Sequence, residues 1–73
     1  MAQVELLVEV DVALSRPPRV DARTWTWVLA ENGPLPASAA CEAEETAMLM
    51  AMCDPRVVMA VGARVIDWKD THA

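Results

Sequence analysis

The sequence predicts a mainly α-helical fold: a compact bundle of three to four short helices in a single small domain, residues 1–73. Prolines and other breaking residues divide the chain into four segments, most of which carry an apolar stripe at helical spacing. Residues that suit helix N-caps stand before three of them. The alternative is an α+β fold, in which residues 4–14 form a strand that pairs with residues 57–68.

The first segment, residues 4–15, ends before Pro17 and Pro18 and fits two structures. Leu6, Leu7 and Val10 begin a helical stripe. The same segment also alternates apolar with mostly polar residues, which is typical of a half-buried strand, and its four valines favour that state. We favour the helix because a lone strand must find a partner, and the remaining segments look helical.

The second segment contains two tryptophans, two positions apart, and is predicted to be a helix over residues 22–31. Asp21 suits its N-cap, and Gly33 suits its C-terminal stop. On a helix, side chains at i and i+2 point about 200° apart. Trp25 and Trp27 would then lie on different faces, one ring packed in the core and the other covered by a second element or exposed to a partner.

The third segment is predicted to be a helix from Ser38, its N-cap, to Cys53. Glu42, Glu44 and Glu45 fall in its first two turns, where negative charge offsets the helix dipole. Residues 47–53 contain no polar side chain, so we expect this part of the helix to be buried on most sides.

The fourth segment is predicted to be a helix over residues 55–68, with Asp54 as its cap and Pro55 at its first position. Its apolar stripe is Val57, Val58, Val61, Val65 and Trp68. A competing interpretation is a β-hairpin that turns at Gly62 and Ala63, which the many β-branched residues favour. Residues 69–73 are expected to be a frayed tail.

Apolar residues are more abundant than a chain of this size can bury. They make up 55% of the sequence, above the ~45–50% usual for soluble domains. We therefore expect a small non-enzymatic protein–protein interaction module, either a homo-oligomer or an inhibitor or adaptor of a larger protein, of a kind that phages and mobile elements encode. The predicted partner-binding residues are Trp25, Trp27, Met48, Met50, Met52 and Trp68.

The formal net charge of −5 bears on nucleic-acid binding. One alternative is a helix-turn-helix-like DNA-binding regulator that uses Arg56, Arg64 and Lys69, but the negative charge disfavours contact with phosphates. Another alternative is an acidic nucleic-acid mimic. In that case the three glutamates near residue 44 would be part of an acidic face.

No catalytic residue, metal site or cofactor is predicted. Met48, Met50, Met52 and Cys53 are soft ligands of the kind that bind Cu(I). At i and i+2 of a helix, however, the thioethers point to opposite sides. The two cysteines and the single His72 do not have zinc-site spacing.

The location predicted from the sequence is the cytoplasm, without a membrane partner. No segment has 18 uninterrupted apolar residues, and Glu5 and Glu9 stand where a signal peptide would be apolar. Cys41 and Cys53 are therefore expected to be reduced.

Overall fold

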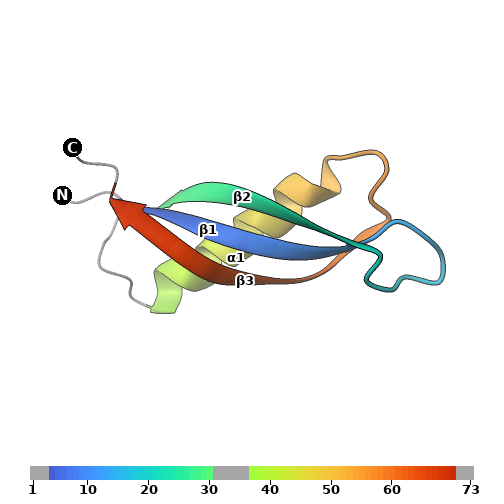
Figure 1. The fold of residues 1–73 in the computed structure, drawn as a ribbon, viewed down its shortest axis with the longest axis horizontal. Helices are drawn as coiled ribbons and strands as arrows, with labels where there is room; N and C mark the ends of the chain where they lie inside the picture. Colours follow the sequence, from blue (N-terminus) through green and yellow to red (C-terminus); the bar gives the residue numbers. More distant parts are fainter. Residues whose placement is uncertain (1–3, 31–36, 71–73) are drawn as a thin grey trace.

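The described part of the protein is a three-stranded antiparallel sheet with one helix on one face (Figure 1). The computed structural model describes residues 4–30 and 37–70. The element order is β1 (Val4–Ala13), β2 (Ala22–Ala30), α1 (Ala37–Met52) and β3 (Met59–Asp70). β1 is the central strand, since the order across the sheet is β2-β1-β3. The predicted bundle of three to four helices is therefore wrong.

β1 alternates between the two faces of the sheet. Its even positions face α1 and are almost fully buried: Val4, Leu6, Val8, Val10 and Val12. The odd positions between them are half-buried on the opposite face. The preferred helix at residues 4–15 was wrong because β1 has a strand on each side, so its backbone groups are paired along both edges.

The loop between β1 and β2 is organised by Asp21. Its carboxylate accepts hydrogen bonds from the Leu14 backbone N–H at 3.1 Å, the Ser15 hydroxyl at 2.6 Å and the Arg19 guanidinium at 3.1 Å. These donors, Ser15 foremost, hold the pKa of Asp21 below its ordinary value. Asp21 thus closes a connection between two strands and caps no helix.

β2 is a strand over Ala22–Ala30, where a helix was predicted. It pairs with β1 along its whole length without a register shift. Val28 and Ala30 are buried against the core, whereas Trp25, Trp27 and Leu29 lie on the other face. The helical prediction failed because flanking turn residues punctuate strands as well as helices, and because β2 carries its larger apolar side chains on its outer face. Gly33 lies outside the described residues.

α1 agrees with the predicted helix at residues 38–53 to within one residue at each end. It packs on the sheet through alanines spaced four apart, which share one side of a helix. These are Ala39, Ala43, Ala47 and Ala51. The predicted burial of residues 47–53 was wrong: within that run only Ala47 is fully buried, and Leu49, Met50 and Met52 are more than half exposed.

β3 is one continuous strand, so both the helix predicted at residues 55–68 and the hairpin turn at Gly62 and Ala63 were wrong. The alternative α+β prediction did anticipate that this segment pairs with β1. Two register shifts interrupt the pairing and leave Ile66 and Val61 as the extra residues of β-bulges. Lys69 and Asp70, assigned to the frayed tail, are the last two residues of β3; the rest of that tail lies outside the described residues.

The bulges explain why β3 resembles a helix in sequence. A regular strand returns to the same face every two residues. Across each bulge of β3 the step is three residues, from Ala60 to Ala63 and from Val65 to Trp68. Steps of three occur on helices, so a bulged strand imitates helical spacing.

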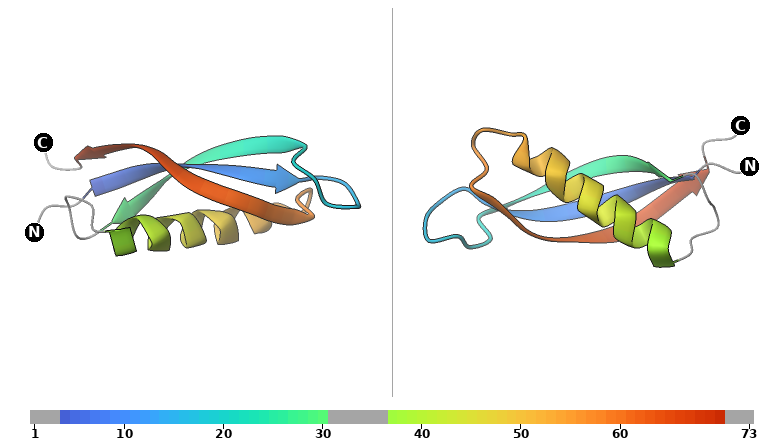
Figure 2. Two further views of the ribbon diagram at one scale, coloured as in Figure 1. Left: turned by 90° about the horizontal axis from the view of Figure 1, so that it is seen from below. Right: turned by 180° about the vertical axis from the view of Figure 1, so that it is seen from behind.

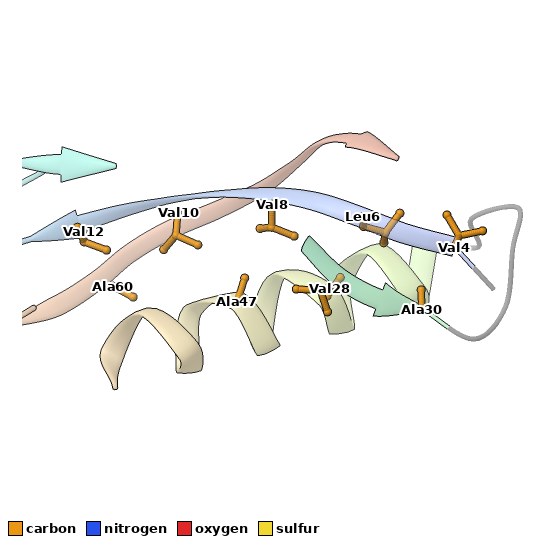
Figure 3. Close-up of a cluster of buried hydrophobic side chains, with 10 residues drawn as sticks. Val4, Leu6, Val8, Val10, Val12, Val28, Ala30, Ala47 and Ala60 are labelled. Atoms are coloured by element: carbon orange, nitrogen blue, oxygen red, sulfur yellow. The ribbon is translucent and has the colours of Figure 1, made fainter. Parts of the chain in front are cut away.

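The core lies between β1 and α1 and is made of small aliphatic side chains (Figure 3). Figure 3 shows the β1 side chains pointing toward α1, with Val28, Ala30 and Ala60 at the sides. Leu6 is the bulkiest fully buried residue, and no polar or charged side chain of the described residues is buried. A core of this kind is stabilised by apolar burial and leaves little space for a ligand.

Candidate protein-interaction surface

One face of the sheet is not covered by α1, and we call it the open face (Figure 2). Its centre is formed by the odd positions of β1: Glu5, Leu7, Glu9 and Asp11. The register places a residue of β2 and a residue of β3 beside each of them. Cross-strand neighbours of this kind are close enough for direct side-chain interaction.

Basic side chains from both outer strands pair with the carboxylates of β1. Arg23 on β2 contacts Asp11 at 3.0 Å. Arg64 on β3 contacts Asp11 at 2.9 Å and also pairs with Glu9. The hydrogen bond from Arg64, with a further contribution from Arg23, lowers the pKa of Asp11. The hydrogen bond to Asp11, with a smaller contribution from Glu9, raises the pKa of Arg64, so Asp11 and Arg64 are both charged at neutral pH.

A fourth ion pair, between Lys69 and Glu5 at 3.2 Å, lies at the other end of the open face. The three bases and three carboxylates of these pairs cancel in charge. The chain as a whole carries −5. The ion-paired centre of the open face is therefore close to neutral. Asp67, which lies beside Leu7 on the same face, adds one negative charge, and the rest of the excess lies elsewhere on the chain.

Beside this ion-pair network, β2 exposes three large apolar side chains. Trp25 is 56% exposed, Trp27 39% and Leu29 53%. The Trp25 indole donates a hydrogen bond of 2.9 Å from Nε1 to Glu9. The Lys69 ammonium lies 4.3 Å from the Trp27 ring centroid, a cation–π distance. Together with half-buried Leu7, these three residues form what we call the open-face patch.

The residues predicted to bind a partner fall into separate places. Trp25 and Trp27 lie together on the open face, since β2 is extended. Met48 packs against the core, whereas Met50 and Met52 are exposed on α1. Trp68 is 50% exposed and pairs with Leu6, which places it on the side of the sheet that faces α1.

Two hollows lie along the outer side of β2, between this strand and α1. One of about 270 Å³ is lined by residues 28–30 of β2 and by α1 residues that include Ala39 and Glu42. The other, of about 230 Å³, lies at the beginning of β2 and includes Thr24, Thr26 and Met50 in its lining. Two separate hollows thus lie between β2 and α1, one near each end of the strand.

Potential metal ligands are dispersed over the described residues. Residues 4–30 and 37–70 contain no group of three or more His, Cys, Asp or Glu side chains placed to hold a metal ion. Cys41 and Cys53 are exposed and free. No helix in this part of the chain is long and apolar enough to cross a membrane.

Leu29 and the ion-pair network were not predicted from the sequence as parts of this surface. Leu29 follows Trp25 and Trp27 at two-residue steps, and this spacing indicates one face of a strand. The sequence did not reveal that Arg64 and Lys69 of β3 share the open face. These residues are five positions apart, and only the bulge at Ile66 brings them to the same face.

Comparison with known proteins leaves the surface as the main guide to function. No protein-family model matches the chain, and no curated protein or solved structure matches it significantly.

Proposed function

We propose that this protein is a small non-enzymatic protein–protein interaction module whose first partner is a second copy of itself. The observation that carries the proposal is the open-face patch, where Trp25, Trp27 and Leu29 remain well exposed although the core has no large aromatic residue. Large apolar side chains gathered at the surface mark interaction sites. Tryptophan is among the residues that contribute most to binding.

Charge supports a second copy as the partner. A basic partner would favour a contact face with unpaired carboxylates, but Glu5, Glu9 and Asp11 are already paired within the open face. Near-neutral faces of two copies can lie against or beside each other without strong repulsion, even on a chain of net charge −5. Fixed indoles also lose little side-chain entropy on binding, and Trp25 is held by Glu9.

The alternatives drawn from the sequence receive less support. A helix-turn-helix needs two helices, and residues 4–30 and 37–70 contain one. In the nucleic-acid mimic, Glu44 would be part of an exposed acidic face. Its carboxylate instead accepts a hydrogen bond of 3.2 Å from the Val65 backbone N–H. The cytoplasmic location remains a prediction, and the free Cys41 and Cys53 are compatible with it.

Sedimentation equilibrium over a wide concentration range tests the proposal. We expect a mass above the 8.0 kDa of one chain, with dissociation on dilution. Trp25→Ala should weaken self-association about tenfold or more, the usual scale for a hot-spot residue. Trp68→Ala is the matched control, because it removes a similarly exposed indole from the other side of the sheet. A mass of one chain at every concentration would refute self-association.

A further inference from the structure

The two outer edges of the sheet differ in how well they are protected. An unpaired strand edge presents free backbone N–H and C=O groups and invites pairing with another chain. Proteins protect such edges with bulges, lysines, prolines or a covering element. β3 has two bulges and Lys69, and the carboxylate of Glu44 on α1 accepts a hydrogen bond from the Val65 backbone N–H.

β2 has no bulge, lysine or proline, and α1 reaches over its beginning only. It pairs with β1 without a register shift, contains no proline or lysine, and has Arg23 as its single charged residue, near one end. The middle of β2, residues 24–29, consists of threonine, tryptophan, valine and leucine. These residue types are favoured or well tolerated in strands. β2 therefore has a long, regular and uncharged outer edge.

We infer that the outer edge of β2 pairs antiparallel with the same edge of a second copy, so that two three-stranded sheets join into one sheet of six strands. This inference rests on the proposed self-association and specifies its geometry. Antiparallel pairing of identical strands is self-complementary, because a two-fold axis relates them. With the axis near Thr26, the middle residue of β2, Trp25 of one copy lies beside Trp27 of the other, an arrangement that favours aromatic cross-strand contact.

The position of α1 supports the same arrangement. α1 crosses the sheet diagonally: its first turns lie on the β3 side, and its last turns reach over the beginning of β2 (Figure 2). The end of β2, at Val28 to Ala30, is left beside the 270 Å³ hollow. A two-fold axis near Thr26 brings the last turns of the partner's helix toward this hollow. In this arrangement the last turns of α1 in each copy would approach the 270 Å³ hollow of the other copy.

The pairing would also join the two open faces. β2 lies at the edge of each sheet, so Trp25, Trp27 and Leu29 of both copies would form one apolar strip along the middle of the six-stranded sheet. No like charges meet along this strip, because Arg23, the one charged residue of β2, pairs with Asp11 in its own copy and would lie opposite Leu29 of the other copy.

A lysine scan of the two edges tests the inference. Thr26→Lys places two ammonium groups beside the two-fold axis, and we expect it to raise the dimer dissociation constant more than about tenfold. Val61→Lys is the control, because it puts the same charge at an exposed bulge on the protected edge. Circular dichroism and thermal melting establish that both variants keep the fold.

Disulfide trapping adds a readout that does not depend on weakened binding. In a chain with Cys41→Ser and Cys53→Ser, we expect Thr26→Cys to form a covalent dimer under mild oxidation. Val61→Cys in the same background should remain mostly monomeric on a non-reducing gel.

The results separate this inference from the proposed function. Efficient trapping through position 26, together with loss of affinity in Thr26→Lys alone, supports the β2 edge. A wild-type dimer with equal affinities for both lysine variants, or equal trapping at positions 26 and 61, overturns the edge geometry and leaves self-association standing. A wild-type chain that remains monomeric at every concentration overturns both.

Discussion

The two faces of β1 show how one strand can serve two purposes. On the side of α1, its even positions form a continuous row of buried aliphatic residues. On the open face, its odd positions are three carboxylates and Leu7, half-buried among the residues of the outer strands. The covered face therefore contributes most of the stability through apolar burial, whereas the open face holds ion pairs and leaves large apolar side chains of β2 exposed.

β2 reverses this arrangement. Its larger apolar side chains, Trp25, Trp27 and Leu29, lie on the open face, and the smaller Val28 and Ala30 lie in the core. For folding of one chain alone the opposite choice would bury more apolar area. This difference between β1 and β2 is the basis of our proposal that the large residues of β2 contact another molecule.

The largest expected effect comes from the adjacent pair Leu6 and Leu7, which lie on opposite faces. Leu6 is fully buried, so Leu6→Ala should lower the free energy of unfolding by about 2–5 kcal/mol, enough to unfold much of the chain. Leu7→Ala should cost clearly less, since Leu7 is only half-buried. Urea denaturation followed by circular dichroism measures both. Equal losses would contradict the contrast between the faces.

The second expected effect concerns the close approach of α1 to the covered face. Ala47 is 1% exposed, so Ala47→Leu should push the helix from the sheet and cost about 1–3 kcal/mol. Leu49→Ala is its control on the same helix, where the side chain is 67% exposed and the expected change is within about 0.5 kcal/mol. Thermal melts of the two variants check this order.

The third expected effect concerns the ion pair between Asp11 and Arg64 on the open face. The folded-state pKa of Asp11 is lowered, so its pairing stabilises the fold above the ordinary pKa of 3.8 and is lost as pH falls through the folded value. Arg64→Gln should raise the pKa of Asp11 and reduce the loss of stability on acidification. NMR titration of the Asp11 carboxyl, with urea denaturation at neutral and acidic pH, measures both changes.

Arg56→Gln is the control for that experiment. Arg56 pairs with Asp54 at 2.8 Å and holds the pKa of Asp54 at about 2. Removal of this guanidinium should move the pKa of Asp54 and leave that of Asp11 unchanged. A shift of Asp11 in both variants would mean that general charge, and not the contact with Arg64, sets its pKa.

The smallest expected effect lies at the contact between Lys69 and Trp27. Lys69→Gln removes the cation and should cost less than about 1 kcal/mol, as for exposed cation–π pairs. It should also change tryptophan fluorescence, since the ammonium lies over the ring. Lys69→Arg keeps the charge and is expected to preserve most of the interaction. Fluorescence that responds identically to both substitutions would contradict the cation–π contact.

Nearby residues were sufficient to predict some secondary-structure elements and insufficient to predict others. α1 could be predicted because its limits depend on nearby residues and it contains a run of helix-forming alanines. β1 fitted a strand and a helix equally well, because the choice depends on whether other strands are present to pair with it. Trp25 and Trp27 were predicted as contact residues, which remains a prediction, and their common face could not be foreseen while residues 22–31 were expected to be helical.

The sequence by itself determined the helix near residues 38–53, the breaks around Pro17 and Asp54, and the surplus of apolar side chains. These properties depend on composition and on residues close together in the chain. Only the tertiary structure decided that β1 lies between β2 and β3, that the bulge at Ile66 brings Lys69 to the open face, and that the β2 edge is unprotected. Such features arise from pairing between distant segments, and register is a property of two strands that neither contains alone.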